Sequence, residues 1–172
     1  MASKISSTNS SKPRCEDSIT ANLFKIQNDA SAHLVRILQK AIEVKTITLK
    51  GKVSSGEGIG TFFVTLPWAR RQFRKKLNFN PYPGTLNLRL SPEADNEELR
   101  DVTRGIKIEA PEGFYGGRCF EASVLGKVCG AVVVPDVPDY PFNVLEIIAP
   151  MNLREELGLK DGMELTVTVW LK

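Results

Sequence analysis

The chain is poor in histidine and cysteine, and it has no long hydrophobic run. Its 172 residues include one histidine and three cysteines. The single histidine, His33, excludes zinc sites with several histidines, and a histidine-based triad would require His33 itself. Cys15, Cys119 and Cys129 are too far apart for a C-x-x-C metal site. No apolar stretch approaches the roughly 20 residues that a membrane span needs, so we expect no membrane partner.

Positive and negative charges are nearly balanced, and the composition is that of a folded protein. The net charge is +3, with 42% hydrophobic and 25% charged residues. This balance is typical of a globular domain and gives little reason to expect nucleic acid as a partner. The N-terminus lacks the apolar core of a signal peptide, and we therefore expect a cytoplasmic protein.

The first 45 residues differ from the rest of the chain. Residues 1–20 are rich in serine and polar, as in disordered segments. The following stretch, "NDASAHLVRILQKAIEV", has apolar residues at helical spacing. We therefore expect residues 1–45 to be a polar, partly disordered extension with one helix, and residues 46–172 to be the folded domain.

From residue 46 onward, short strands dominate the expected structure. The expected strands are "KTITLKGKV", "GTFFVTL", "LNLRL", "GIKIEA", "GRCFEASVL", "KVCGAVVVP", "VLEIIAP" and "ELTVTVWL". Short helices are expected at "WARRQFRKKL" after Pro67, at "SPEADNEELR", and at "MNLREELGL", which Gly158 closes. Many short strands without a βαβ rhythm favour a small β-barrel with helical additions.

The stretch "SSGEGIG", Ser54 to Gly60, places three glycines between two of the expected strands. Glycine lets backbone N–H groups approach a bound anion, and it also suits a plain hairpin loop. The stretch is not a P-loop, because no Lys-Ser/Thr pair follows the last glycine. Both interpretations stay open on these residues alone.

The stretch "NPYPGTLNLRL", Asn80 to Leu90, runs from a turn into a strand with a leucine face and a polar face. Thr85 and Asn87 lie on the polar face and point the same way. Their neutral oxygens suit a Mg²⁺ ion that arrives with nucleotide phosphates and keeps several waters. The alternative is a strand whose polar face only meets water.

Three further places in the chain carry groups that could contact a ligand. The stretch from Arg70 to Lys76, "RRQFRKK", could contact phosphate or form a solvated helix face. The N–H groups of Met151 to Leu153 begin a short helix and could bind an anion, with Arg154 in reach. Glu146 is either an outward-facing strand residue or a polar contact inside a pocket.

Taken together, "GKVSSGEGIGTFFV", "FNPYPGTLNLRL" and "VLEIIAPMNLREELGLKDGMELTV" resemble, in order and spacing, the CTP-dependent riboflavin kinases of archaeal type. The resemblance covers about residues 47–172. It implies a mainly β fold, a compact six-stranded cradle-loop β-barrel with short helices. It also implies transfer of the terminal phosphate of CTP to the 5′-hydroxyl of riboflavin, giving FMN and CDP, with one Mg²⁺ per CTP and no covalent cofactor.

The resemblance further implies roles for particular residues. The metal site of the family falls on Thr85 and Asn87. Its acidic flavin contact, a candidate proton acceptor, falls on Glu146, and weaker flavin positions fall on Pro138 and Tyr140. The implied nucleotide-binding positions are Gly56, Glu57, Gly58, Ile59, Gly60, Thr61, Met151, Asn152, Leu153 and Arg154.

One segment departs from the family pattern and keeps other functions open. Family members usually carry an "RT-x-YP"-like segment, whereas this chain has "VPDYP". Val137 replaces the arginine and Pro138 the threonine, so a hydroxyl donor is missing from the expected acceptor site. The alternatives are a CTP-dependent kinase with another acceptor, and a DNA-binding regulator of related barrel fold. The sequence is compatible with a monomer.

Overall fold

A computed structural model describes residues 45–56, 59–91, 96–101 and 103–171. The helix expected within residues 1–45 therefore lies outside the described residues. In chain order the elements are β1 (Lys45–Ser54), α3 (Ile59–Thr65), α4 (Pro67–Leu77), β2 (Leu86–Leu90), the 3₁₀-helix η1 (Glu97–Arg100), β3 (Ile106–Ile108), β4 (Gly117–Val124), β5 (Val128–Pro135), β6 (Val144–Ile148), α5 (Leu153–Leu157) and β7 (Glu164–Leu171). Among the described residues, no helix has the length and apolarity needed to cross a membrane.

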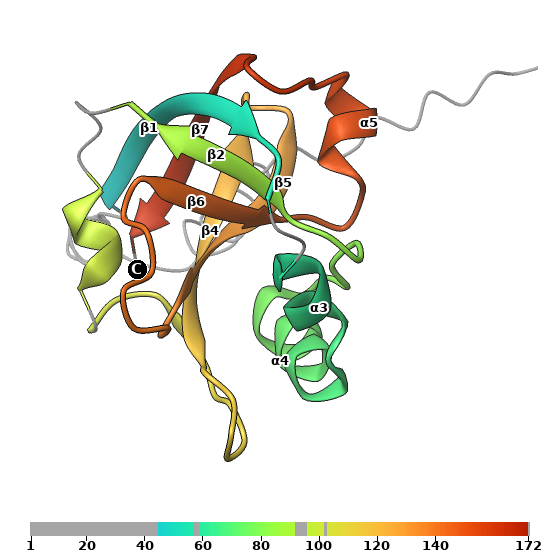
Figure 1. The fold of residues 1–172 in the computed structure, drawn as a ribbon, viewed down its shortest axis with the longest axis vertical. Helices are drawn as coiled ribbons and strands as arrows, with labels where there is room; N and C mark the ends of the chain where they lie inside the picture. The colour runs from blue at the N-terminus through green and yellow to red at the C-terminus, as the bar shows by residue number, and fades with distance from the viewer. Residues whose placement is uncertain (1–44, 57–58, 92–95, 102, 172) are drawn as a thin grey trace, which may run out of the picture.

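Six antiparallel strands close into a barrel, as predicted (Figure 1). Their order is β4-β5-β6-β2-β1-β7, and the pairing of β4 with β7 closes the ring. The long strand β1 pairs with β7 along most of its length and with β2 through its second half. Strand β3 pairs with β4 in a hairpin that projects away from the barrel (Figure 1).

Alternate residues of the strands fill the barrel interior. Leu86, Leu88 and Leu90 of β2 are all buried there, together with the apolar residues of β7. Successive side chains of a strand point to opposite faces, so the residues between these leucines point out of the barrel. This alternation places Thr85 and Asn87 on the outer surface.

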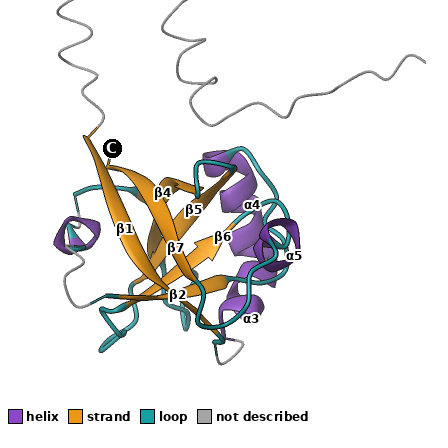
Figure 2. Ribbon diagram, turned by 90° about the horizontal axis from the view of Figure 1, so that it is seen from above, coloured by secondary structure: helices purple, strands orange, loops and turns teal. Residues whose placement is uncertain are grey.

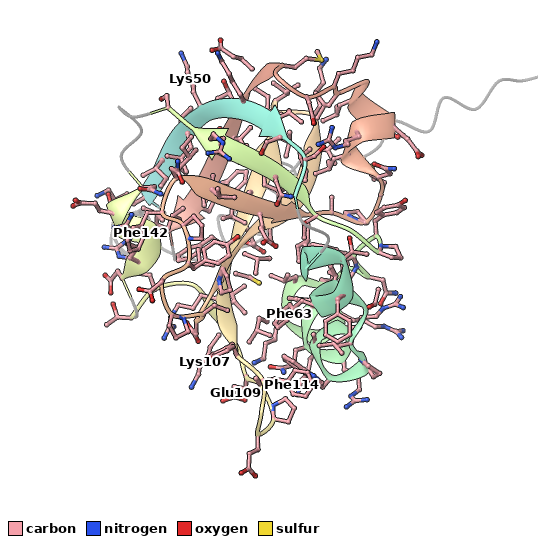
Figure 3. The ribbon with its side chains drawn as sticks, in the orientation of Figure 1. Lys50, Phe63, Lys107, Glu109, Phe114 and Phe142 are labelled. Atoms are coloured by element: carbon pink, nitrogen blue, oxygen red, sulfur yellow. The ribbon has the colours of Figure 1, made fainter. Side chains whose placement is uncertain are left out.

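The helices α3, α4 and α5 gather on one side of the barrel (Figure 2). Helix α4 begins at Pro67, as predicted, and buries Phe73 against the outer faces of β5 and β6, where Val133 and Ile148 lie. A second apolar layer therefore lies between these helices and the barrel wall. Near the start of α4, Trp68 packs edge-on against Phe63 and Phe114. Phe114 lies between β3 and β4, so α4 also contacts the projecting hairpin; Figure 3 labels the two phenylalanines.

The prediction of a strand at "GTFFVTL" was wrong, because this stretch forms α3. In a strand, Phe62 and Val64 would share one face, yet Phe62 is 61% exposed and Val64 only 2%. A short apolar run suits either element, and its surroundings decide between them. Here Val64 packs with Phe73 of α4 in the apolar layer outside the barrel, and helical geometry leaves Phe62 exposed.

Two of the other predicted helices can be compared with the structure. Of "SPEADNEELR", residues 92–95 lie outside the described residues, and Glu97–Arg100 form a 3₁₀-helix that buries Leu99. Helix α5 forms as predicted and ends at Gly158, whose backbone is left-handed.

Candidate functional site

The polar face of β2 lies opposite Glu146. Antiparallel pairing sets Asn87 beside Glu146 of β6 and, on its other side, beside Ser54 of β1. Residues that are paired in this way point to the same face of the sheet. Thr85, Asn87 and Glu146 are each half-buried on the outer surface of the barrel. The structure thus brings the predicted metal ligands Thr85 and Asn87 close to the predicted flavin contact Glu146.

The glycine loop closes over this polar face. A Cβ atom added at Gly60 would lie 2.5 Å from Thr85 Oγ1 and 2.7 Å from Glu146 Oε2. A Cβ added at Gly56 would collide with the side-chain amide of Asn87. Only glycine allows such an approach of backbone to side chain. The loop leads from β1 into α3, so the hairpin-loop interpretation was wrong.

The structure says less about the other predicted positions of the glycine loop. Glu57 and Gly58 lie outside the described residues. The backbone of Ile59 begins α3, and Thr61 lies exposed within that helix. Gly56 and Gly60 therefore carry the structural case for this loop.

Tyr140 is the hydrogen-bond partner of Glu146. Its hydroxyl donates to Glu146 Oε1 at 2.7 Å. Burial, followed by the hydrogen bond and the charge of Glu146, raises the pKa of Tyr140 well above its usual value. Tyr140 therefore stays protonated and remains a donor. Pro138, the third predicted flavin position, is exposed.

The segment before α5 is fixed by its own contacts. Asn152 caps the helix, since its Oδ1 accepts from the N–H of Arg154 at 3.1 Å. Leu153 is buried in the core, which leaves only its backbone for a ligand. A small cavity of about 40 Å³ separates this segment, including Met151, from Thr85. The four predicted positions therefore lie next to the polar face of β2.

Arg154 has partners that the sequence did not reveal. Its Nη2 donates to the Ser54 carbonyl at 3.0 Å and forms an ion pair with Asp161 at 2.8 Å. Asp161 also accepts from Ser55 Oγ at 2.6 Å. These contacts connect the start of the glycine loop with the turn before β7. No spacing rule predicts the contacts of Ser54 and Ser55, because their partners are 100 and 106 positions away in the chain.

Tyr140 also lines a larger cavity. Its volume is about 300 Å³, and it is enclosed by η1, the ends of β5 and β6, and the loop between them. At its rim the Arg100 guanidinium lies 3.6 Å from the ring centre of Phe142, and Asn96 donates to the Phe142 carbonyl at 2.7 Å. Figure 3 shows Phe142 on the side of the molecule away from Phe63. The volume is at the lower limit of small-molecule sites.

The basic stretch from Arg70 to Lys76 lies on α4, away from the residues that surround Glu146. Phe73 and Leu77 are its buried apolar positions. Lys76 donates to the Lys107 carbonyl at 2.7 Å, so this cation supports the projecting hairpin. The remaining cations of the stretch are exposed, as predicted for a solvated face.

The buried thiol of Cys119 lies beneath α4 and has no catalytic character. Burial raises its pKa to about 12. The thiol therefore stays protonated at neutral pH and contributes packing only. Within the described ranges, no group of three or more histidine, cysteine and acidic side chains could hold a metal ion.

Comparison with known proteins identifies the family. Residues 53–169 match the family model CTP-dep_RFKase, whose description reads "Domain of unknown function DUF120". The chain belongs to this family. The CTP-dep_RFKase match includes all three glycines of the loop, Thr85, Asn87, Tyr140, Glu146 and the segment before α5.

Several curated relatives carry the name riboflavin kinase. The relative from Archaeoglobus fulgidus is 45% identical over 131 residues, which are 73% of this chain and 56% of the relative. The relative from Methanocella arvoryzae is 45% identical over 122 residues, or 70% and 56% of the two chains. The relative from Pyrobaculum calidifontis is 38% identical over 151 residues, or 83% and 69%. The chain thus spans little more than half the length of the first two.

Proposed function

We propose that this protein is a CTP-dependent riboflavin kinase, which transfers the terminal phosphate of CTP to the 5′-hydroxyl of riboflavin and releases FMN and CDP. The observation that carries the proposal is the approach of Gly60 to both Thr85 and Glu146. It brings a loop suited to phosphate, two neutral oxygen ligands and a carboxylate to one place. The names of the family and of the curated relatives support the same activity.

The donor set at this place fits Mg²⁺. Thr85 Oγ1, the Asn87 side-chain oxygen and the Glu146 carboxylate are hard oxygen ligands. A side chain at Gly60 would fill the space between two of them. We propose that Thr85 and Asn87 hold the ion. When bound with CTP, Mg²⁺ would neutralise charge on the phosphate oxygens.

The residues around this place would divide the remaining work of phosphoryl transfer. Backbone N–H groups of the glycine loop would bind the phosphates, and the segment from Met151 to Arg154 would bind the rest of CTP. Glu146 would hydrogen-bond the riboflavin 5′-hydroxyl and accept its proton as the new O–P bond forms and the bond to CDP breaks. Phosphoryl transfer depends mainly on such alignment.

We propose the cavity of about 300 Å³ beside Tyr140 as the place of the acceptor. Tyr140 lines this cavity and also donates to Glu146, which connects the cavity with the candidate proton acceptor. The lining residue Val137 and the neighbouring Pro138 depart from the family pattern, and this departure keeps a different acceptor as the second candidate function.

Three further expectations stay predictions: a cytoplasmic location, a monomeric state and the division of the chain near residue 45.

A single assay tests the proposal. The full chain is incubated with Mg²⁺, riboflavin and either CTP or ATP, and the formation of FMN is followed. We expect FMN with CTP. Binding of CTP by calorimetry without FMN would favour another acceptor, and no binding of either nucleotide would contradict both kinase functions.

The role of Glu146 is tested by Glu146→Gln in the same assay. The amide keeps the size of the side chain but accepts a proton poorly, so the catalytic rate should fall by about 10²-fold or more. An unchanged rate would show that Glu146 is not the proton acceptor. Glu155→Gln, on the exposed face of α5, is the matched control.

A further inference from the structure

A tight turn brings Tyr140 to Glu146. The N–H of Tyr140 lies 3.3 Å from the carbonyl oxygen of Val137, to which it donates, and this bond closes a β-turn over residues 137–140. Pro138 is the second residue of the turn, where its fixed φ is favoured. Asp139 is the third and has a φ of 56°, a left-handed conformation that aspartate tolerates. The segment that departs from the family pattern therefore has a defined structural task.

The two oxygens of the Glu146 carboxylate face different partners. Oε1 accepts from the Tyr140 hydroxyl at 2.7 Å. Oε2 lies 2.7 Å from the position that a Cβ of Gly60 would occupy, on the side where Thr85 Oγ1 lies. One oxygen is thus held by the turn, and the other faces the loop proposed to bind phosphate.

The Tyr140 hydroxyl has the properties of a fixed donor. Tyr140 is half-buried, and both its burial and the neighbouring carboxylate raise its pKa. The hydroxyl donates to Glu146 Oε1, so its loss would remove a contact that holds the carboxylate. Tyr140 also lines the larger cavity, and a phenylalanine at this position would keep that wall contact.

We propose that Tyr140 is a positioning residue, whose hydroxyl holds Glu146 Oε1 so that Oε2 faces the space next to Gly60 and Thr85. This inference rests on the proposed function and adds a residue to it. A glutamate has three rotatable side-chain bonds, and loss of the hydrogen bond would let the carboxylate turn away. A misplacement of about 1 Å at a reacting group can cost about 10²-fold in rate.

The test is Tyr140→Phe in the full chain, which removes only the hydroxyl. We expect kcat for FMN formation to fall by about 10- to 100-fold, because the carboxylate loses its orientation. The dissociation constant of CTP, measured by calorimetry, should stay within about twofold, because the Tyr140 hydroxyl donates to Glu146, which is not one of the proposed nucleotide residues. Tyr115→Phe is the matched control, since Tyr115 lies exposed in the projecting hairpin.

A double-mutant cycle separates positioning from direct contact. If Tyr140 acts through Glu146, adding Tyr140→Phe to Glu146→Gln should lower kcat by less than about twofold more. A further tenfold loss in the double variant would overturn the inference, because it would show a direct role for the hydroxyl. Equal losses of kcat and of CTP affinity in Tyr140→Phe would also overturn it, because they would indicate a general disturbance of the site.

Failure of this inference and failure of the proposed function give different results. A wild-type protein that forms FMN, together with a Tyr140→Phe variant of unchanged kcat, would overturn only the positioning role. A wild-type protein that forms no FMN would overturn the proposed function and the positioning role with it.

Discussion

On one side of Glu146 the candidate site is made of paired strands and close backbone contacts, and on the other side it is made of a loop around a cavity. Thr85 and Asn87 lie at the start of β2, and Gly56 and Gly60 lie directly against them. The proposed acceptor side has a turn, the 3₁₀-helix η1 and an exposed aromatic ring at the cavity rim. We therefore expect the proposed nucleotide side to tolerate few changes of shape, and the exposed rim of the proposed acceptor side to tolerate more.

This contrast has a physical cause. Phosphates and a hard cation require ligands at fixed distances, which paired strands provide. The flat aromatic ring system of the proposed acceptor would be bound largely by contact area, which many loop sequences can supply. The departures at Val137 and Pro138 lie on the proposed acceptor side, in the turn that leads to Tyr140. The following predictions measure this difference between the two sides.

The largest effect is expected for Gly60→Ala. The added methyl group would lie 2.5 Å from Thr85 Oγ1 and 2.7 Å from Glu146 Oε2, so the loop or both side chains must shift. We expect FMN formation to fall by about 10²- to 10³-fold, as measured by steady-state kinetics. Gly113→Asn is the control, because nothing lies within 4 Å of a Cβ there and asparagine tolerates the positive φ of 82°. Near-normal activity in Gly60→Ala would contradict the close approach.

Thr85→Ala and Asn87→Ala should each have the next largest effect. Removing one of two proposed metal ligands should lower activity by about 10- to 100-fold, and more at limiting Mg²⁺. The measurement is a magnesium titration of the rate at fixed CTP. Arg89→Ala is the matched control, because Arg89 is the next outward-facing residue of β2. A magnesium dependence equal to that of the wild type would argue against the ligand assignment.

Phe142→Ala should have a smaller effect, confined to the acceptor. The ring is 64% exposed at the cavity rim and contacts Arg100, so its loss removes one wall contact. We expect the KM for riboflavin to rise by about 3- to 10-fold, while the KM for CTP stays within about twofold. Tyr115→Ala, another exposed aromatic residue, is the control. A larger rise in the KM for CTP would place the cavity on the wrong substrate.

Asp161→Asn should have the smallest effect, on stability. Its hydrogen bond from Ser55 and then the Arg154 guanidinium hold the pKa of Asp161 below the usual value of 3.8. A lowered folded-state pKa stabilises the fold above pH 3.8, and this contribution is lost as the pH falls through the lowered pKa. We expect Tm at pH 7 to fall by about 1–3 °C, because the group is exposed.

The control for this change is the pH dependence itself. The difference in Tm between wild type and Asp161→Asn should shrink as the pH is lowered below 3.8. A difference that is the same at pH 7 and at pH 3 would show that the charge of Asp161 is not the cause. Glu155→Gln, an exposed change on α5, should leave Tm unchanged at both values.

Local patterns allowed much of the fold to be predicted. The alternation in β2 predicted its buried leucines, Pro67 marked the start of α4, and Gly158 marked the end of α5. Each of these signals depends on the backbone and on neighbours a few residues away. The stretch "GTFFVTL" lacked such a signal, because a short apolar run does not distinguish a strand from a helix. Its surroundings, an apolar layer in which Val64 packs beside Phe73 of α4, are a property of the tertiary structure.

The amino-acid sequence by itself determined which residues of β2 face out of the barrel, because the period of a strand is fixed by backbone geometry. It also contained the blocks that resemble the riboflavin kinase family. Only the tertiary structure decided that Gly60, Thr85 and Glu146 meet, since closure of the barrel brings residues from distant segments together. The same holds for the bond from Tyr140 to Glu146, because its formation depends on the turn at Pro138 and on the path of the loop.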